Sequence, residues 1–550
     1  MGDAGVRSRK KPMPSCNGED NPPSAGARKG ADVLQVFCCE IAWRIFEKKG
    51  MQMTATARCA DAPFTRHTNW RSVDWKIVRA EVTRLQVRIA KAVRQKKFRK
   101  ARSLQWILTH SYYAKLWAIR RVTTNKGKRT PGVDGIIWTT SGQKLDAVKL
   151  LKRRGYHPLP LRRIYIPKKN KTKKRPLSIP TMTDRAFQAL HKLVLEPVAE
   201  TTADPNSYGF RIARRCADAI GQCFNTLAKT VSPQWILEAD IRACFDEISH
   251  SWMLENILMD TEVLRKWLNA GYMENGSVYP TTKGTPQGGI ASPTLANMVL
   301  DGLEHAAKAA APARISGNIR SKINVIRYAD DFVITGDSKE LLETKVKPAI
   351  ESFLSERGLS LSRSKTRIVR IDEGFDFLGQ NVRKYTGKLI IKPAKQNVQS
   401  FLHDIRKTIR KHLGMSAVSM IGQLNPKIRG WANYHRHVVS GTTFSYIDTC
   451  IWNSLWQWMK RRHRNKSATW LKRKYWSSGS RASMFSTRVK DKRGVARLYE
   501  VIRACHIGIV RHVKIKGEAN PFDPKYDKYY AQRRLSRKHR KRKRLAESLA

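Results

Sequence analysis

The sequence predicts an α+β protein made of several packed modules. Its 550 residues are too many for one hydrophobic core, and the 41% that are hydrophobic provide enough apolar surface to fold. Four β-rich runs alternate with helical stretches between residues 160 and 390, which is typical of α/β or α+β domains. The runs are residues 162–167, 235–241, 323–335 and 365–371. Because helical patterns precede and follow them, we expect a sheet-containing domain between helical modules.

The charge balance indicates a polyanionic partner. Lysine and arginine number 106 against 44 aspartates and glutamates, so the net charge is +62. An excess of this size repels itself in a compact chain, and nucleic acid would offset it better than a membrane surface. Nine scattered cysteines without a Cys-x-x-Cys pair argue against a disulfide framework or a zinc site. They favour a reducing, cytoplasmic compartment, and neither a membrane-spanning run nor a secretory signal is expected.

The first 120 residues divide into a leader and two amphipathic helices. Residues 1–70 are rich in Gly, Pro, Ser and basic residues, and we expect a mostly disordered leader. A helical stripe of apolar residues follows, and a second stripe runs through residues 104–119. The first stripe consists of Val78, Val82, Leu85, Ile89 and Val93. Basic residues surround it, so the pair is either an ordinary solvated helical pair or an extension that contacts RNA.

Two acid-bearing strand ends are the strongest chemical signal. β-rich runs flank Asp330 and Asp331, which predicts a tight hairpin with paired acids at its tip. A second run delivers Asp240 and Asp246 some 90 positions earlier. Crowded carboxylates repel unless a cation lies between them, and hard oxygen ligands select Mg²⁺. Two such ions would support an in-line phosphoryl displacement. The alternative is a charged hairpin turn without chemistry.

The chain becomes helical again after residue 392. An apolar stripe begins at Val398 and has Arg406 and Arg410 beside it. Six of the fifteen tryptophans follow within the next 80 residues. These are Trp431, Trp452, Trp456, Trp458, Trp470 and Trp476. We expect most of them in the core of a helical module, with a minority beside basic residues that stack on bases or sugars.

Eight sequence motifs occur in one order and carry a family resemblance. They are residues 162–168, 175–180, 208–211, 240–246, 284–293, 328–331, 358–366 and 377–379. This series closely resembles that of reverse transcriptases. Beyond it, Arg429–Arg436 resembles the maturase domain of group II intron-encoded proteins, and Thr130–Gly135 resembles the N-terminal part of the same family.

The resemblance implies a right-hand polymerase and a domain order. We expect an N-terminal RNA-binding extension and the start of the fingers at 71–159. Fingers and palm with an antiparallel sheet would follow at 160–392, and a helical thumb or maturase domain at 393–470. A basic DNA-binding region and tail would occupy 471–550, where nine of the twelve residues 533–544 are Lys or Arg. The family often ends in an HNH nuclease with cysteine pairs, and we expect none here.

The resemblance also implies roles for single residues. Asp240, Asp330 and Asp331 match the metal-binding aspartates of a two-Mg²⁺ site, and Ile241 is counted with them as a metal ligand. The other matches are taken one by one. Lys168 and Arg175 match finger residues that clamp the incoming dNTP. Gln287 and Gly288 match a loop against the nascent pair. Phe245 matches the aromatic residue that excludes a ribose 2′-OH, with core packing as its alternative. Lys365 matches a lysine that protonates pyrophosphate, with a solvated lysine as its alternative.

The implied function is an RNA-directed DNA polymerase that binds its group II intron RNA, assists splicing and reverse transcribes the intron at a target DNA. Its partners would be intron RNA, target DNA, dNTPs and RNA/DNA heteroduplex, within a nucleoid-associated ribonucleoprotein. The nucleic-acid-binding candidates are Arg88, Arg94, Arg406, Arg410 and Arg436. Two alternatives remain open: a splicing factor with a vestigial polymerase site, or a domesticated reverse transcriptase of a defence system.

Overall fold

The computed structural model describes residues 69–167, 174–316, 319–477, 484–490 and 494–536. The expected leader at 1–70 and the end of the basic tail lie almost entirely outside these ranges, as does Lys168. The described residues combine helices and sheets, and all four predicted β-rich runs contain strands. The α+β class is therefore confirmed at this level.

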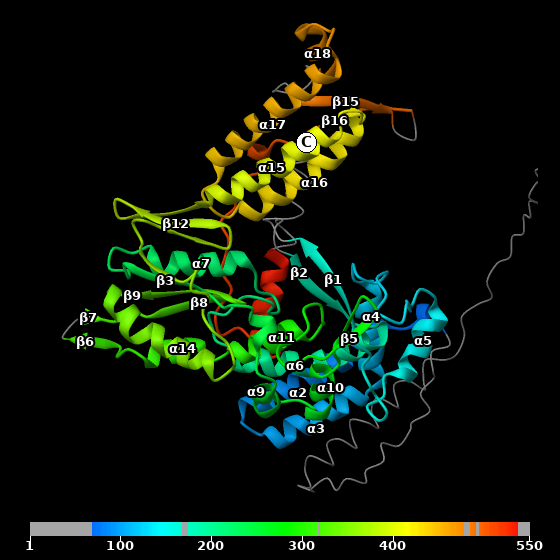
Figure 1. Cartoon of the computed structure of the whole chain (residues 1–550), viewed down its shortest axis with the longest axis vertical. Helices are drawn as coiled ribbons and strands as arrows, with labels where there is room; N and C mark the ends of the chain where they lie inside the picture. Colours follow the sequence, from blue (N-terminus) through cyan, green and yellow to red (C-terminus); the bar gives the residue numbers. More distant parts are fainter. Residues whose placement is uncertain (1–68, 168–173, 317–318, 478–483, 491–493, 537–550) are drawn as a thin grey trace, which may run out of the picture. The chain divides into compact units, whose positions relative to one another are not determined.

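Four antiparallel strands form the sheet that carries the predicted acids, in the order β10-β3-β9-β8. Their bounds are β3 Trp235–Asp240, β8 Asn324–Tyr328, β9 Asp331–Gly336 and β10 Arg367–Arg370. Successive side chains point to opposite faces. Val333 packs in one hydrophobic cluster with α7 (Cys216–Leu227), whereas Phe332 and Ile334 pack in another with α14 (Lys347–Ser355). Helices therefore cover both faces of this sheet (Figure 1), which explains its continuous apolar runs.

A second four-stranded sheet has the order β2-β1-β4-β5. Its strands are β1 Leu161–Pro167, β2 Lys174–Ile179, β4 Tyr272–Glu274 and β5 Ser277–Tyr279. β1 pairs antiparallel with β2 and parallel with β4. Between β3 and β8 the chain also contains α8 Cys244–Glu247, α9 His250–Asn256, α10 Thr261–Leu268, α11 Ser292–Leu300, α12 Leu303–Ala309, β6 Arg314–Ser316 and β7 Ile319–Arg320. Further along, α13 spans Lys339–Leu341 and η2 spans Leu342–Val346.

The N-terminal helices belong to the main hydrophobic core. They are η1 Trp70–Ser72, α2 Trp75–Arg94, α3 Phe98–His110, α4 Tyr112–Thr124 and α5 Ser141–Leu150. Asp74 caps α2 by accepting from the backbone of Lys76 and Ile77. Every residue of the predicted stripe on α2 is buried, and Gln86 donates to the Leu193 carbonyl on α6 (Met182–Thr202) at 2.7 Å. The stripe is therefore confirmed, and removing α2 would expose the core.

A three-stranded sheet leads into the helical module. Its strands are β11 Phe375–Phe377, β12 Gln380–Tyr385 and β13 Lys388–Pro393. The module contains α15 Lys395–Lys411, α16 Ala417–His435, α17 Gly441–Arg462, α18 Ala468–Tyr475, β14 Trp476–Ser477, β15 Met484–Lys490, β16 Ala496–Glu500 and η3 Ala504–His506. Trp458 and Trp476 are buried in its core, and Trp431, Trp456 and Trp470 pack against it. Trp452 is the exception among the six, with 39% of its surface exposed. The expectation that most of these tryptophans belong to the core is therefore confirmed.

The chain beyond residue 507 returns to α7, where Asp218 holds it. This fully buried carboxylate accepts hydrogen bonds from the Ile515 backbone at 2.7 Å and from His512 Nε2 at 2.8 Å. Arg533 donates to it at 3.1 Å. The segment contains η4 (Pro524–Tyr526) and continues as a helix through residues 527–536.

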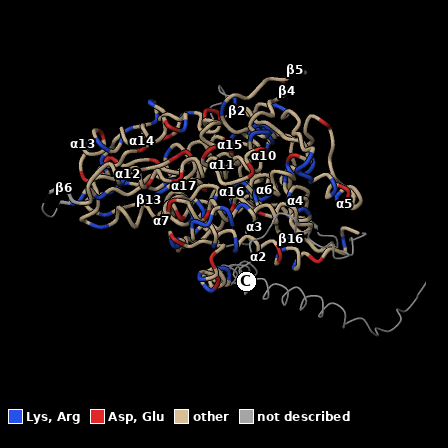
Figure 2. Tube along the Cα trace, turned by 90° about the horizontal axis from the view of Figure 1, so that it is seen from below, with Lys and Arg blue, Asp and Glu red and all other residues tan. Residues whose placement is uncertain are grey.

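Lysine and arginine are spread over the described trace, with fewer acidic residues between them (Figure 2). No described helix is both long and apolar enough to cross a bilayer.

Candidate active site

The predicted hairpin is present, and it places two acids beside a third. β8 and β9 pair with Tyr328 opposite Asp331, which leaves Ala329 and Asp330 as a two-residue turn. Ala329 has a φ of +59°, in the left-handed region that tight turns use. Asp240 ends β3 directly opposite Asp331 in the ladder. Three carboxylates thus meet at one edge of the sheet, as the sequence predicts.

The acid edge is crowded enough to shift its own protonation. Burial, and then the charge of Asp240, raise the pKa of Asp330. Burial, followed by the charges of Asp240 and Asp330, raises the pKa of Asp331 to about 7. The ionised forms of both side chains are therefore disfavoured until positive charge reaches this edge.

Lys365 supplies one such charge. Its Nζ atom lies 2.6 Å from Asp240 Oδ2, although the two residues are 125 positions apart. Backbone hydrogen bonds hold this arrangement, because Ser362 N donates to the Asp240 carbonyl at 2.8 Å. The Lys365 side chain is 65% exposed, so it is free to approach a ligand. The structure thus brings Lys365 to the acids and does not leave it as a remote surface lysine.

The acid edge fits a divalent cation that a substrate helps to hold. Across the described ranges, no group of three or more His, Cys, Asp or Glu side chains forms a complete metal site. Mg²⁺ commonly takes one or two protein carboxylates and completes its shell with water and phosphate oxygens. Two carboxylates with raised pKa values beside Asp240 suit that chemistry. Ile241 donates its backbone N–H to the Asp330 carbonyl at 3.3 Å, so it belongs to the same edge.

Asp246 has a different position from the one that the sequence indicated. β3 ends at Asp240, and Asp246 lies in α8. Gln287 Nε2 donates to both Asp246 oxygens, at 3.0 and 2.9 Å. The expectation of a second acid on the strand end is wrong, because a left-handed residue, Ala243, turns the chain into the short helix.

Phe245 and Gln287 line one pocket of about 360 Å³, together with Asp246 and with residues of β1, β2 and β4. Phe245 is half-buried, and its ring contacts Phe210 edge-on with centroids 6.3 Å apart. Gln287 accepts a hydrogen bond from Ser178 N through its carbonyl at 2.6 Å. Gly288 follows with a φ of +126°, and a Cβ atom there would lie 2.4 Å from the Ser178 carbonyl oxygen. Glycine is therefore required for the close approach of this loop to β2.

Arg175 acts electrostatically on one carboxylate of the acid edge. It lies on β2 opposite Ile166, its side chain is exposed, and its charge lowers the pKa of Asp330 against the larger effect of burial. Lys168, its predicted companion, lies outside the described residues.

Sequence reasoning missed a buried network that supports the Ala329–Asp330 turn. Gly209 packs on the turn so closely that a Cβ atom would lie 2.3 Å from Ala329 N. Asn297 Nδ2 donates to the Gly209 carbonyl at 2.7 Å. Arg327, which is 1% exposed and directly precedes Tyr328, donates to Asp301 Oδ1 at 2.6 Å and to Asn297 Oδ1 at 3.3 Å. Burial, opposed by Arg327, raises the pKa of Asp301 to about 7.

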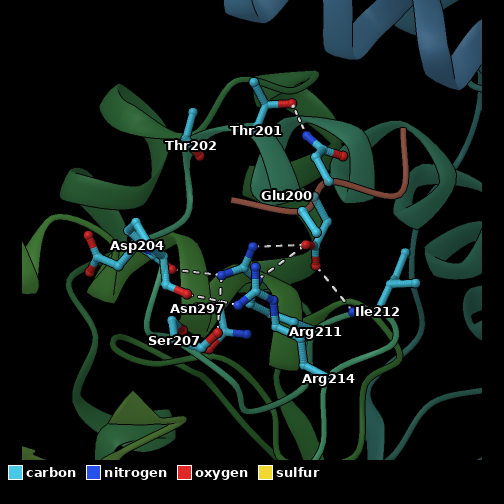
Figure 3. Close-up of polar contacts among 12 residues, drawn as sticks. Glu200, Thr201, Thr202, Asp204, Ser207, Arg211, Ile212, Arg214 and Asn297 are labelled. Atoms are coloured by element: carbon cyan, nitrogen blue, oxygen red, sulfur yellow. Dashed lines mark hydrogen bonds and ion pairs between the residues drawn. The ribbon is translucent and has the colours of Figure 1, made fainter. Parts of the chain in front are cut away.

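The same network extends to Arg211, as Figure 3 shows. Arg211 donates to Glu200 Oε2 at 2.9 Å and to the carbonyls of Asp204 and Ser207 at 2.8 and 3.1 Å. Both ionic side chains are about 95% buried, at 5% and 4% exposed. A buried pair of this kind is destabilising when one partner is lost, so it fixes the loop that carries Gly209. Its signal in the sequence was the Tyr208–Arg211 motif.

Comparisons with known proteins agree with this geometry. Residues 166–382 match the family model of the reverse transcriptase (RNA-dependent DNA polymerase), and residues 70–151 match that of the N-terminal domain of reverse transcriptase. Residues 398–476 match the maturase-specific domain of group II introns. The three matches include α2–α5, the sheet β10-β3-β9-β8 and α16–α18, whereas β13 and the chain beyond residue 476 lie outside them.

Relatives with curated names point in the same direction. The group II intron-encoded protein LtrA of Lactococcus lactis subsp. cremoris is 29% identical over 414 residues, covering 58% of this chain and 68% of its own. Protein YkfC of Escherichia coli is 31% identical over 305 residues, covering 48% of this chain and 79% of its own. An uncharacterized 91 kDa protein in the cob intron of Schizosaccharomyces pombe is 26% identical over 426 residues, covering 62% of this chain and 52% of its own.

The chain belongs to the group II intron-encoded reverse transcriptases. As a member of this family it is an RNA-directed DNA polymerase with a maturase domain, and this family membership implies intron RNA binding.

Of the five predicted nucleic-acid-binding residues of this reverse transcriptase, two lie on an exposed helix face and two others form contacts within the protein. Arg406 and Arg410 lie on the exposed side of α15. Arg94 forms an ion pair with Asp523 at 3.1 Å and so links α2 to the C-terminal segment, with 45% of its side chain exposed. Arg436 donates to Asn433 Oδ1 at 3.1 Å and to the Gly508 carbonyl. Arg88 lies on α2, a helix with one buried face.

Proposed function

We propose that the acid edge is the site at which this reverse transcriptase copies its intron RNA into DNA. The observation that carries the proposal is the pairing of Asp240 with Asp331 across β3 and β9, with Asp330 in the adjoining turn and Lys365 at 2.6 Å. Asp240, Ile241, Asp330 and Asp331 would hold Mg²⁺ together with the phosphates of a bound dNTP. Bound Mg²⁺ supplies the charge that activates a primer 3′-hydroxyl and stabilises the leaving oxygen in phosphoryl transfer.

The residues around this edge would orient the reactants. The exposed Arg175 offers its guanidinium to the triphosphate, and Lys168 would act with it. Lys365 carries a mobile ammonium beside Asp240, so it is placed to give a proton to pyrophosphate as the charge on that group develops. Phe245 borders the pocket in which the sugar of the incoming nucleotide would lie, with Gln287 on the same wall. An aromatic wall at the sugar leaves no room for a 2′-hydroxyl.

We assign the polymerase subdomains from the same elements. β1 and β2 with the preceding helices would form the fingers, and the sheet β10-β3-β9-β8 with α7 and α14 the palm. The thumb would begin at α15. Its core includes Val501 and Ala504, so we place the end of this module near residue 504, beyond residue 470 where the sequence motifs end. Residues 507–536 would then form the start of the DNA-binding region.

Intron RNA binding would use the exposed basic faces of α2 and α15. On α2 the buried stripe leaves Arg79, Arg84 and Lys91 exposed. On α15, Arg406 and Arg410 are exposed in the same way. The proposed cycle is splicing assistance followed by reverse transcription of the intron at a target DNA. A protein that only assisted splicing would have no use for three crowded carboxylates, each costly to bury.

The substitution Asp330→Asn tests the proposal. It should abolish cDNA synthesis on poly(rA)/oligo(dT), since loss of one group that stabilises developing charge typically costs about 3–4 kcal/mol. Intron RNA affinity should stay within a few fold, because phosphate contacts elsewhere supply it. The matched control is Asp146→Asn, which removes an exposed carboxylate paired with Lys149. Extension near the wild-type rate by the Asp330 variant would refute the assignment.

A further inference from the structure

A basic pocket of about 690 Å³ adjoins the catalytic turn and has no role in the mechanism above. Its walls come from the start of α7, the end of α16 and the C-terminal segment, and Tyr328 forms part of its lining. Five of the lining residues are arginines from these three distant parts of the chain. They are Arg214, Arg215, Arg436, Arg511 and Arg533.

Carboxylates balance the positive charge of this pocket only in part. None of its described lining residues is an aspartate or glutamate. The fully buried Asp218 pairs with two of the lining side chains, His512 and Arg533. The two terminal nitrogens of Arg214 donate hydrogen bonds to neutral acceptors. These are the carbonyls of Pro205 and Gly517, at 2.8 and 2.6 Å. Figure 3 shows Arg214 beside Arg211, whose own charge is paired with Glu200.

Buried donors in the pocket wall also lack acceptors. Arg214 is 8% exposed and the Arg533 side chain 10%, yet the Nε atoms of both have no hydrogen-bond partner within the described residues. An unpaired buried donor costs about 1–3 kcal/mol, so these two guanidinium groups keep part of their hydrogen-bonding capacity unused next to the pocket.

The donor set matches a phosphodiester. A guanidinium presents a planar fork that suits two phosphate oxygens, and arginine is the residue of choice for such contacts. Cys216 and Ala217, the first two residues of the 12-residue helix α7, also line the pocket. Their end of the helix carries partial positive charge, which adds to the attraction for an anion. The volume is in the range of pockets that enclose a ligand of nucleotide size.

The position of Tyr328 identifies the strand. Tyr328 ends β8 two residues before Asp330, so the pocket adjoins the hairpin to which the 3′-hydroxyl of a primer would be brought. We infer that the pocket binds a backbone phosphate of the primer DNA strand, within a few nucleotides of its 3′ end. The C-terminal segment would thus complete the primer track, which gives a reason for its return to α7. This inference rests on the proposed function, which supplies the primer.

The first test uses the two exposed arginines of the pocket, because their replacement leaves the buried network intact. Arg215→Gln/Arg511→Gln in the full chain should weaken binding of an RNA template annealed to a DNA primer. The slope of log K against log[salt] should fall by about 1 for each arginine, hence by about 2 in total. The matched control is Arg154→Gln/Arg265→Gln, two exposed arginines far along the chain from the pocket residues. Equal slopes for the two double variants would overturn the inference.

The second test identifies the strand by neutralising single phosphates. Methylphosphonate linkages are scanned along the primer from its 3′ end, and along a DNA template in a parallel series. At one primer position the neutral linkage should weaken binding to wild type but leave the affinity of Arg215→Gln/Arg511→Gln unchanged. Loss of additivity in the template series alone, or full additivity in both series, would contradict the assignment. Primer extension by wild type in the same samples separates failure of this inference from failure of the proposed polymerase site.

Discussion

Arg327→Met should destabilise this protein in a way that grows with pH. Arg327 is buried beside Asp301, whose pKa is raised to about 7 mainly by burial. The folded pKa lies above the unfolded value of about 3.9, so the folded state binds more protons and this carboxyl lowers stability as pH rises. In wild type the decrease ends near pH 7. Without Arg327 the folded pKa moves higher, and the decrease continues above pH 7.

The magnitude follows from the contacts. At pH 7 the variant folds with a neutral Asp301 and loses two hydrogen bonds, at 2.6 and 3.3 Å, for about 1–3 kcal/mol. Each pH unit above 7 adds about 1.4 kcal/mol, hence roughly 2 kcal/mol at pH 8.5. The sum, about 3–5 kcal/mol, is what removing one partner of a buried ion pair typically costs.

Thermal unfolding midpoints at pH 7.0 and 8.5 measure this difference. With about 2.1 cal/mol/K of unfolding entropy per residue, 1 kcal/mol shifts the midpoint of the compact unit His67–Ala550 by roughly 1 °C, so the gap between wild type and variant should widen by roughly 2 °C. Arg327→Met/Asp301→Asn lacks the titrating carboxyl and should show a gap that does not change with pH. Arg79→Met is the control for an exposed arginine. A gap that stays constant for Arg327→Met, or that widens equally in the double variant, would refute this reasoning.

Two further predictions concern Phe245 and the Gln287–Gly288 loop. Phe245→Ala should lower the ratio of kcat/KM for dNTP over rNTP, because the aromatic wall of the roughly 360 Å³ pocket is lost, and an unchanged ratio would return Phe245 to core packing. Gly288→Ala should slow primer extension by at least tenfold, because its Cβ atom would lie 2.4 Å from the Ser178 carbonyl at a φ of +126°. Gly414→Ala, where nothing lies within 4 Å of the new atom, should behave as wild type; equal behaviour of the two variants would contradict the close approach.

The acid edge was predictable from the sequence because its signals are local. Continuous apolar runs on either side of the Asp330–Asp331 pair specify a hairpin, and a second apolar run ends at Asp240. The helical stripe from Val78 to Val93 was equally visible, since its spacing directly records the buried face. Chemistry that depends on a strand end or a helix face can be found in this way.

The supporting residues could not be predicted, because burial and long-range pairing leave no local pattern. Arg327 reads as a surface residue of a strand, yet its charge is buried against Asp301. His512 lies 294 positions from Asp218, and their pairing assembles a pocket that no single segment encodes. Arg94 appeared as a nucleic-acid contact within a basic helix, whereas the fold pairs it with Asp523.

The most direct measurement of the central claim is divalent-cation binding at the acid edge. Mn²⁺ binding is followed by electron paramagnetic resonance on the full chain with an RNA template, a chain-terminated primer and the next dNTP. Wild type should bind Mn²⁺ in this complex, and the Asp330→Asn and Asp331→Asn variants should lose at least tenfold in affinity, with Asp146→Asn unchanged. Equal Mn²⁺ affinity in wild type and both acid-edge variants would contradict the assignment of Asp240, Asp330 and Asp331 as the cation site.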